Sequence, residues 1–425
     1  MFSRLQRTYL AIFAENPFLL LFAVVTGTGE AAFALITMYA LPVYLVQVLG
    51  VSGFALGAAN ATFLLAETVL KFPFGRLSDR LGRKGFVVLG PLAVCLNPTI
   101  FMAVPARLWF LVFPLRVADG VGAAALWPPL FAAVGDLVKE RSRAAAMSVM
   151  NAVYVAAIGA AVVIGYLSAH LTGSDRLPFY IASGLMFVSA ATAYRGFPRL
   201  TTHGGAPVRP TEAAEAEAAC PREGRVESSV LALVVAISVL MSAGVISLSS
   251  FLVLYLNIDM ALKPVEFGAL LGGLAIAVVA LGLPLGHLAD RWGTSKAVML
   301  SLVVSALAMW AIPSCRSLAA LAPVAVVLVL GHILGTPAWL AVVSQLAPTA
   351  RRGGVMALVA TGEGIGGFLG PLVGGVLWEL HHPWIFYGSA LLLTSAALLA
   401  LSVLPKLPSF REGELVTPVS GQVPR

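Results

Sequence analysis

The feature of this sequence that most constrains its fold is a series of long apolar runs, separated by short polar or glycine- and proline-bearing stretches. Each run is close to the roughly 20 residues that an α-helix needs to cross the hydrocarbon core of a bilayer. Of the 425 residues, 59% are hydrophobic and only 11% are charged, whereas a soluble domain carries about 25% charged residues. So few charges cannot cover a water-facing surface, which excludes a soluble enzyme, a nucleic-acid-binding protein and a disordered scaffold. The chain is therefore predicted to be an all-α polytopic membrane protein.

The apolar runs predict twelve transmembrane helices in two groups of six. The first group lies near residues 17–46, 54–74, 84–104, 107–134, 145–171 and 177–198, and the second near 229–257, 265–288, 295–313, 319–346, 354–379 and 383–404. A polar stretch between them contains prolines, glycines and an Ala/Glu run, which is typical of a flexible linker. The predicted organisation is an N-terminal six-helix bundle (1–199), a cytoplasmic linker (200–228), a C-terminal six-helix bundle (229–405) and a disordered cytoplasmic tail (406–425).

The distribution of lysine and arginine predicts the orientation in the membrane. The net charge is +7, and the positive charges lie mostly in short loops. With the N-terminus in the cytoplasm, the basic loop residues that fall outside are Arg107, Arg176, Lys263 and Arg316. Because cytoplasmic loops are enriched in lysine and arginine, we expect both termini and the linker to lie on the cytoplasmic side of a plasma (inner) membrane. The three cysteines are scattered without metal-ligand or disulfide spacing, and no cofactor or metal is expected.

An internal repeat is the most specific pattern in the chain. The loop expected after the second helix reads Gly75-Arg-Leu-Ser-Asp79-Arg80-Leu-Gly82-Arg83-Lys84, and the loop after the eighth reads Gly286-His-Leu-Ala-Asp290-Arg291-Trp-Gly293. The two stretches are 211 residues apart, and the same offset relates Gly120 to Gly331. Two halves with the same orientation are therefore expected, related by an axis along the membrane normal. Such architectures place a substrate site between the repeats near the bilayer midplane.

The first stretch resembles the GxLaDrxGrk loop motif of the major facilitator superfamily at nearly every position. The copy departs from it with Thr294 and Ser295 after Gly293. The resemblance covers the chain apart from the linker and both tails, and it implies a secondary transporter that works by alternating access. Physically, the glycines allow close helix approach and a sharp turn, and Asp79 can pair with an arginine or a helix N-terminus. We expect this cluster to latch the cytoplasmic side while the protein faces outward; alternatively, its basic residues only set the topology.

Glu30 is the leading candidate for proton coupling. It lies 13 residues into the first predicted helix, about 20 Å along it at 1.5 Å per residue, and no basic residue lies within four positions. Ionisable residues at membrane depth are costly, so each is a functional hypothesis. A carboxyl without hydration or a partner exchanges a proton near neutral pH. Glu30 is therefore expected to couple protons or to bind a cationic substrate; the alternative is a neutral glutamic acid bonded to a neighbouring helix.

Arg116 and Asp119 form a second candidate for proton coupling. At a spacing of three residues the two side chains share a helix face and can pair. The run from Arg116 to Gly122 resembles the RxxqGxgaa motif of the superfamily's fourth helix, which is linked to proton transfer centred on the arginine. Here Asp119 replaces a glutamine-like residue. The arginine is expected to hold Asp119 ionised until a proton or substrate competes; the alternative is a static ion pair that fixes helix packing.

Two further acids lie at membrane depth. Glu67 precedes Lys71 by four residues, which favours a structural ion pair on one helix face. Glu363 lies about a third of the way along the eleventh predicted helix, within a glycine-rich stretch. It either lines the cavity or packs against small residues near the cytoplasmic mouth.

The eleventh predicted helix fits gxxxGPxxGG, the superfamily's antiporter motif, through Gly366, Gly370, Pro371, Gly374 and Gly375. The family places this motif in helix five, where this chain lacks the Gly-Pro core. Small residues four apart permit tight helix contact, so ordinary close packing is the alternative to a special role. Other polar and aromatic residues within helices are candidates for lining a central cavity: Asn60, Trp127, Asn151, Tyr154, Tyr255, His332 and Trp339. We expect Pro128, Pro129 and Pro337 to unwind or bend the helices near them.

These features favour a proton-coupled secondary transporter that exports amphipathic or drug-like compounds. Proton-coupled uptake of a nutrient and a lipid-moving carrier remain alternatives, as does a different class, a non-transporting receptor or assembly subunit. A membrane-embedded enzyme is disfavoured because no nucleophile-base or metal set can be assembled from the sequence. The expected partners are a small-molecule substrate, protons and the lipid bilayer, with the protein acting as a monomer and without nucleic acid.

Overall fold

The computed structural model describes residues 18–138, 143–197, 228–263, 266–274, 276–277, 281, 285, 292–346 and 352–404. Within these ranges the chain is helical and contains no strand, and eleven helices are long and apolar enough to cross a membrane. This confirms an all-α polytopic fold. The eighth predicted helix, 265–288, is described only in part. Most of the predicted linker (200–228) and the whole tail (406–425) lie outside the described residues.

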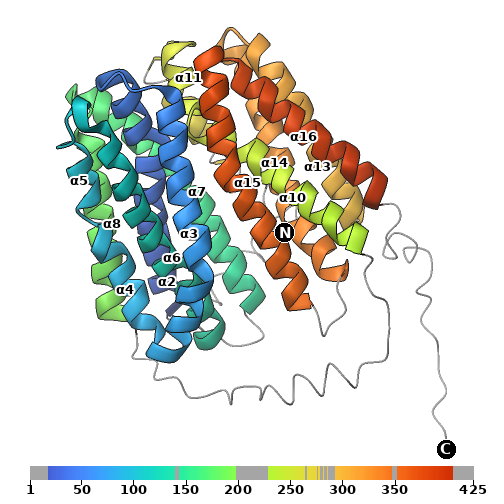
Figure 1. The fold of residues 1–425 in the computed structure, drawn as a ribbon, viewed down its shortest axis with the longest axis horizontal. Helices are drawn as coiled ribbons and strands as arrows, with labels where there is room; N and C mark the ends of the chain where they lie inside the picture. The colour runs from blue at the N-terminus through green and yellow to red at the C-terminus, as the bar shows by residue number, and fades with distance from the viewer. Residues whose placement is uncertain are drawn as a thin grey trace, which may run out of the picture.

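The helices form two groups that stand side by side, which we call the N-terminal and C-terminal halves (Figure 1). The N-terminal half contains α2 (Phe18–Ala34), the π-helical segments η1 (Leu35–Ala40) and η2 (Val43–Val48), α3 (Gly53–Leu81), α4 (Arg83–Val94), α5 (Asn97–Phe101), η3 (Ala106–Leu111), α6 (Val112–Leu137), α7 (Arg143–Thr172) and α8 (Leu177–Gly196). The C-terminal half contains α10 (Ser228–Ser249), α11 (Leu252–Ile258), α13 (Thr294–Ala311), η5 (Ile312–Ser314), α14 (Leu318–Leu346), α15 (Arg352–Leu380) and α16 (Trp384–Val403).

Two of the predicted helices are interrupted. The third is divided into α4 and α5 by a turn at Cys95 and Leu96, and Pro98 lies in the first turn of α5, where its missing N–H costs no hydrogen bond. The seventh is divided into α10 and α11 by a turn at Ser250 and Phe251.

The prolines inside α6 and α14 do not unwind these helices. Pro128 and Pro129 lie within a continuous α6, and Pro337 lies within a continuous α14. Of the two expected effects, unwinding is therefore excluded, and a bend at these prolines stays a prediction. A membrane helix tolerates proline because neighbouring helices satisfy the backbone groups that the proline leaves without a hydrogen bond.

The predicted loop at Gly75 is mostly helix, which corrects the sequence-based boundary at residue 74. α3 continues to Leu81, so Gly75, Asp79 and Arg80 lie in its last two turns. The chain turns at Gly82, whose φ of +95° is a conformation that favours glycine. Gly293 has the same φ of +95° and directly precedes α13. The repeat is therefore present in the backbone geometry, 211 residues apart.

The two halves touch at one end, which we call the contact end. There the backbone N–H of Gly53, in the first turn of α3, donates to the carboxylate of Glu379 near the end of α15. The hydroxyl of Tyr166 in α7 donates to the carbonyl of Leu262 at 2.8 Å, and its ring stacks on Phe267 with centroids 3.8 Å apart.

The opposite end carries the Gly82 turn with Arg83 and Lys84, and we call it the basic end. Contacts between α3 and α15 extend from the contact end as far as Thr68, whose side chain faces Gly364. Beyond that level the two helices diverge towards the basic end (Figure 1). The packing of α3 against α15 is the main contact between the halves, and we call it the seam.

Candidate functional site

A fully buried ion pair lies within the N-terminal half. Arg116 and Asp119 are one turn apart on α6, with 3.1 Å between the Nη1 atom of Arg116 and the Oδ2 atom of Asp119. Neither side chain is exposed (0% each). The spacing in the sequence predicted this pairing, and the two side chains do meet.

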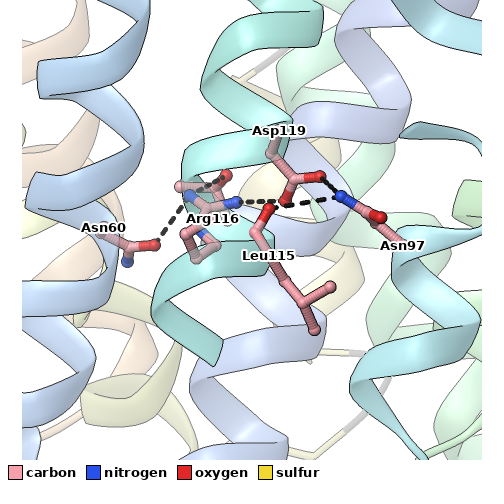
Figure 2. Close-up of polar contacts among 6 residues, drawn as sticks. Asn60, Asn97, Leu115, Arg116 and Asp119 are labelled. Carbon is pink, nitrogen blue, oxygen red and sulfur yellow. Dashed lines mark hydrogen bonds and ion pairs between the residues drawn. The ribbon is translucent and has the colours of Figure 1, made fainter. Parts of the chain in front are cut away.

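Three further elements supply hydrogen bonds to the pair, and Figure 2 shows two of the contributing residues, Asn60 and Asn97. The Nη2 atom of Arg116 donates to Thr37 in η1 at 3.1 Å and to the side-chain oxygen of Asn60 in α3 at 2.9 Å. The side-chain amide of Asn97 in α5 donates to the Oδ1 atom of Asp119 at 2.9 Å. The guanidinium carbon of Arg116 also lies 4.3 Å from the ring centroid of Phe63. Such bonds compensate the loss of hydration that makes a buried ion pair costly.

The partners of the pair are the residues that sequence reasoning missed. Thr37 and Asn97 were not identified as candidates, and Asn60 was identified only as a cavity residue. Each lies on a different helix from the pair, and an isolated threonine or asparagine within an apolar run carries no pattern. The one available signal was their polarity within membrane-length runs.

Glu30 is buried on α2 with 6% of its surface exposed. Its carboxyl forms a hydrogen bond with the hydroxyl of Tyr154 on α7. Glu67 on α3 lies near enough for repulsion, and Lys71 near enough for attraction. Among the described residues no lysine or arginine forms an ion pair with Glu30. Its hydrogen-bonding partner is therefore a neutral phenol rather than a cation.

A chain of aromatic contacts leads from Tyr154, the hydrogen-bonding partner of Glu30, to the ion pair. Trp127 on α6 packs edge-on against Tyr154 at 5.4 Å between centroids and lies 6.5 Å from Phe33 on α2. Phe33 lies 6.0 Å from Phe63, whose ring faces Arg116. Phe33, Phe63 and Trp127 are all buried. The two candidate proton-coupling groups are thus connected by one apolar aromatic cluster.

Glu67 and Lys71 form the ion pair that their spacing predicted, with 2.9 Å between Nζ and Oε1. Lys71 is half-exposed, at 48% of its side chain, and also attracts the half-buried Glu363 of α15. This lysine therefore lies between acids of the two halves. The strength of an ion pair this exposed is modest.

At the basic end, Arg83 joins two helices of the N-terminal half. It lies 3.4 Å from Asp79 at the end of α3 and 3.1 Å from Asp136 near the end of α6. Lys84 donates to the carbonyl of Phe197, next to α8, at 2.6 Å. Gly75 makes only an ordinary contact with Pro128, so close helix approach is not its role, whereas Gly82 provides the turn. Arg80 is exposed.

The second copy of this motif lies mostly outside the described residues, because Gly286, Asp290 and Arg291 are not among them. Its Gly293 provides the same turn as Gly82. Gly120 and Gly331, related by the same offset, are both tightly packed: a Cβ on Gly120 would collide with the α3 backbone, and one on Gly331 would lie 2.8 Å from the Ser305 hydroxyl.

The glycine-rich stretch of α15 packs on two sides. Gly366, Gly370 and Gly374 lie against the α10 backbone at Val239, Ala243 and Ser247, where any Cβ would collide. Gly375 lies against Gly53 and Phe54 of α3, at the seam between the halves. The four-residue spacing thus serves close packing within the C-terminal half, and α15 is held between α10 and α3.

The other predicted cavity residues do not form one cluster. Trp339 on α14 is buried, and its indole nitrogen has no hydrogen-bond partner among the described residues. Tyr255 is buried and packs edge-on against Phe386. His332 and Asn151 are exposed. Of the predicted set, Tyr154 therefore bonds Glu30, Trp127 packs against Tyr154, and Asn60 lies at the ion pair.

The helical fold, with its membrane-length helices and a fully buried ion pair among the described residues, is that of a polytopic membrane protein. The sequence profile of the Major Facilitator Superfamily matches residues 19–278 and 231–419. The chain belongs to this family of secondary transporters.

Similar proteins include several with names that refer to drug resistance. The chain is 24% identical to Multidrug resistance protein 1 of Bacillus subtilis over 364 residues, covering 85% of this chain and 90% of the relative. It is 24% identical to the Quinolone resistance protein NorA of Staphylococcus aureus, covering 80% of this chain and 85% of that protein.

Solved structures share the fold at low sequence identity. A bacterial homologue of the human lysosomal transporter Spinster, in an inward-facing and occupied conformation, matches with a TM-score of 0.74 at 15% identity, covering 94% of this chain and 97% of that one. The nucleoside transporter NupG matches with a TM-score of 0.72 at 14% identity, covering 91% and 99%. At this identity the likeness concerns the fold alone.

Proposed function

We propose that this protein is a proton-coupled exporter of amphipathic, drug-like molecules that works by alternating access. The names of Multidrug resistance protein 1 and NorA support the substrate class, because the chain aligns with most of the length of each. Family membership supports the transport cycle. Neither the names nor the family identifies the coupling ion, so the argument for protons rests on the residues of the site.

The observation that carries proton coupling is the environment of Glu30. Its carboxyl is buried, its hydrogen-bonding partner is the neutral Tyr154, and the Tyr154 ring packs against Trp127, which lies near Phe33. A carboxyl in such a place exchanges between charged and neutral forms when water reaches it from either side. Aromatic rings suit a flat apolar substrate, and a carboxylate suits a cationic one.

The Arg116–Asp119 pair is proposed to be the second coupling element. Arg116 stabilises the charged form of Asp119, and a proton or substrate that competes for Asp119 releases the guanidinium. The pair lies where η1, α3, α5 and α6 meet. A change in its charge therefore acts on several helices at once.

The orientation proposed from the lysine and arginine distribution places the basic end in the cytoplasm. The contact end then faces outward, and the described arrangement, with the halves joined there, corresponds to an inward-facing protein. In this arrangement the ion pair of Asp79 is with Arg83 of its own half. This supports a latch at the basic end that engages only when the protein faces outward.

The proposal is tested with purified protein in liposomes that contain a pH-sensitive dye. Addition of ethidium, a cationic aromatic probe, is expected to produce proton movement that depends on the protein and on the probe. An Asp119→Asn variant is expected to bind the probe without moving protons. The matched control is Asp175→Asn, which changes an exposed loop acid. Probe transport by the wild type without proton movement would contradict the coupling, and binding without any transport would contradict the transporter itself.

A further inference from the structure

One hydrogen bond joins the surroundings of the ion pair to the opposite half of the molecule. The side-chain nitrogen of Asn60 on α3 donates to the hydroxyl of Ser250 at 2.7 Å, and both residues are fully buried (0% exposed). The two residues are 190 positions apart in the sequence. Ser250 lies in the interruption between α10 and α11, at a place where the helix can change direction.

Asn60 uses both ends of its amide. Its oxygen accepts from the Nη2 atom of Arg116 at 2.9 Å, while its nitrogen points to Ser250. Because a guanidinium has only donors, the amide oxygen must face Arg116. The position of Arg116 therefore fixes the direction in which Asn60 donates.

We propose that Asn60 is a positioning residue that transmits the charge state of the Arg116–Asp119 pair to the contact between the two halves. The pair holds the guanidinium, the guanidinium orients the amide, and the amide holds Ser250. Neutralisation of Asp119 removes the anchor of Arg116, weakens the bond between Asn60 and Ser250, and allows the contact end to open. The inference rests on the proposed function, because that function gives the pair a reason to change charge.

The groups that face the pair are few and come from known elements. On α6, Arg116 and Asp119 pair with each other. From neighbouring elements, η1 contributes Thr37 and α5 contributes Asn97. From α3, Glu67 attracts Arg116. Glu30 on α2 interacts instead with Tyr154, Glu67 and Lys71. We call the series Asp119, Arg116, Asn60 and Ser250 the relay. Substitution of Asp119 by asparagine therefore tests the relay separately from the titration of Glu30.

The test measures the separation of the halves directly. Spin labels are placed at Val48 and Ile258, exposed residues at the ends of η2 and α11 near the contact end, in a background without Cys95, Cys220 and Cys315. The wild type, Asp119→Asn, Ser250→Ala and the double variant are compared by distance distributions in lipid nanodiscs. Asp119→Asn is expected to raise the open population about threefold or more, as expected for loss of one hydrogen bond. In the Ser250→Ala background, which is already open, Asp119→Asn is expected to add nothing.

A matched control lies three residues before Ser250, near the end of α10. The Ser247 hydroxyl is bonded to Ser389 at 2.7 Å, within the C-terminal half. Ser247→Ala removes a buried serine bond that does not cross between halves, so Asp119→Asn must keep its full effect there. Ser250→Thr keeps the hydroxyl and should restore that effect. Asn60→Leu removes the relay at its centre and replaces Ser250→Ala if that variant does not fold.

The outcomes separate the relay from the proposed function. Equal effects of Asp119→Asn with and without the Ser250 hydroxyl would overturn the relay, and so would an unchanged distance in Asp119→Asn. Ser250→Ala is also expected to bind ethidium with wild-type affinity while its maximal transport rate falls. If the wild type moves no protons although the wild type and the three variants show the expected distances, the relay stands and proton-coupled export fails.

Discussion

Gly57 on α3 faces the backbone carbonyl of Pro371 on α15, so a methyl group added at the Cα atom of Gly57 would collide with the other half of the molecule. The Cα atom of Gly375 would lie only 3.2 Å from that methyl carbon. A glycine-to-proline contact of this kind lets the two helices approach backbone to backbone. The seam between the halves therefore depends on the absence of a side chain at Gly57.

Gly57→Ala is expected to hold the halves apart at the contact end and to lower the transport rate about tenfold or more. The physical reason is overpacking, which costs about 1–3 kcal/mol, and about 1.4 kcal/mol corresponds to a tenfold change in an equilibrium. Transport in liposomes and the spin-label distance described above measure the two effects. Gly184→Ala on α8 meets open space and serves as the control. A wild-type rate in Gly57→Ala would show that the seam need not close this tightly.

Arg116→Ala is expected to destabilise the protein more than the double change Arg116→Ala with Asp119→Asn. The single change leaves a buried carboxylate without its cation, which costs about 3–5 kcal/mol, whereas the double change leaves a neutral amide beside Asn97. Thermal unfolding in one detergent compares the two variants. Additive losses would mean that the two side chains stabilise the fold independently.

Much of the fold followed from the sequence because each signal was local. A membrane helix satisfies its own backbone within a single apolar run, so the runs gave the helices. The pairs Arg116–Asp119 and Glu67–Lys71 lie within one turn and were identified by spacing alone. The turn at Gly82 and its copy at Gly293 were identified because glycine tolerates positive φ.

The rest could not be predicted because it depends on contacts between distant helices. Asn60 and Ser250, or Tyr166 and Leu262, meet only after two halves have packed. The end of α3 was placed too early because polar residues suggested a loop, although Asp79 and Arg83 pair across one turn at the Gly82 bend. Similarly, Tyr154 could not be assigned to Glu30, since α2 and α7 are brought together only by tertiary packing.

Asp79→Asn is expected to lower transport strongly while the protein still inserts and folds. Asp79 is exposed and its ion pair with Arg83 is long at 3.4 Å, so its loss costs little stability. Its effect should therefore appear only when the basic end closes. Asp290→Asn is expected to be milder, because its motif has Thr294 and Ser295 after Gly293. Transport at matched expression measures both variants, and wild-type rates in both would exclude a latch.

The measurement that tests proton coupling most directly is the response of Glu30→Gln liposomes to an imposed pH gradient. The substitution keeps the size and hydrogen bonding of the side chain but removes its titration. Gradient-driven accumulation of ethidium is expected to be lost, while binding and exchange of the probe without a gradient persist. Accumulation at the wild-type rate in Glu30→Gln would contradict the assignment of Glu30 as the coupling group.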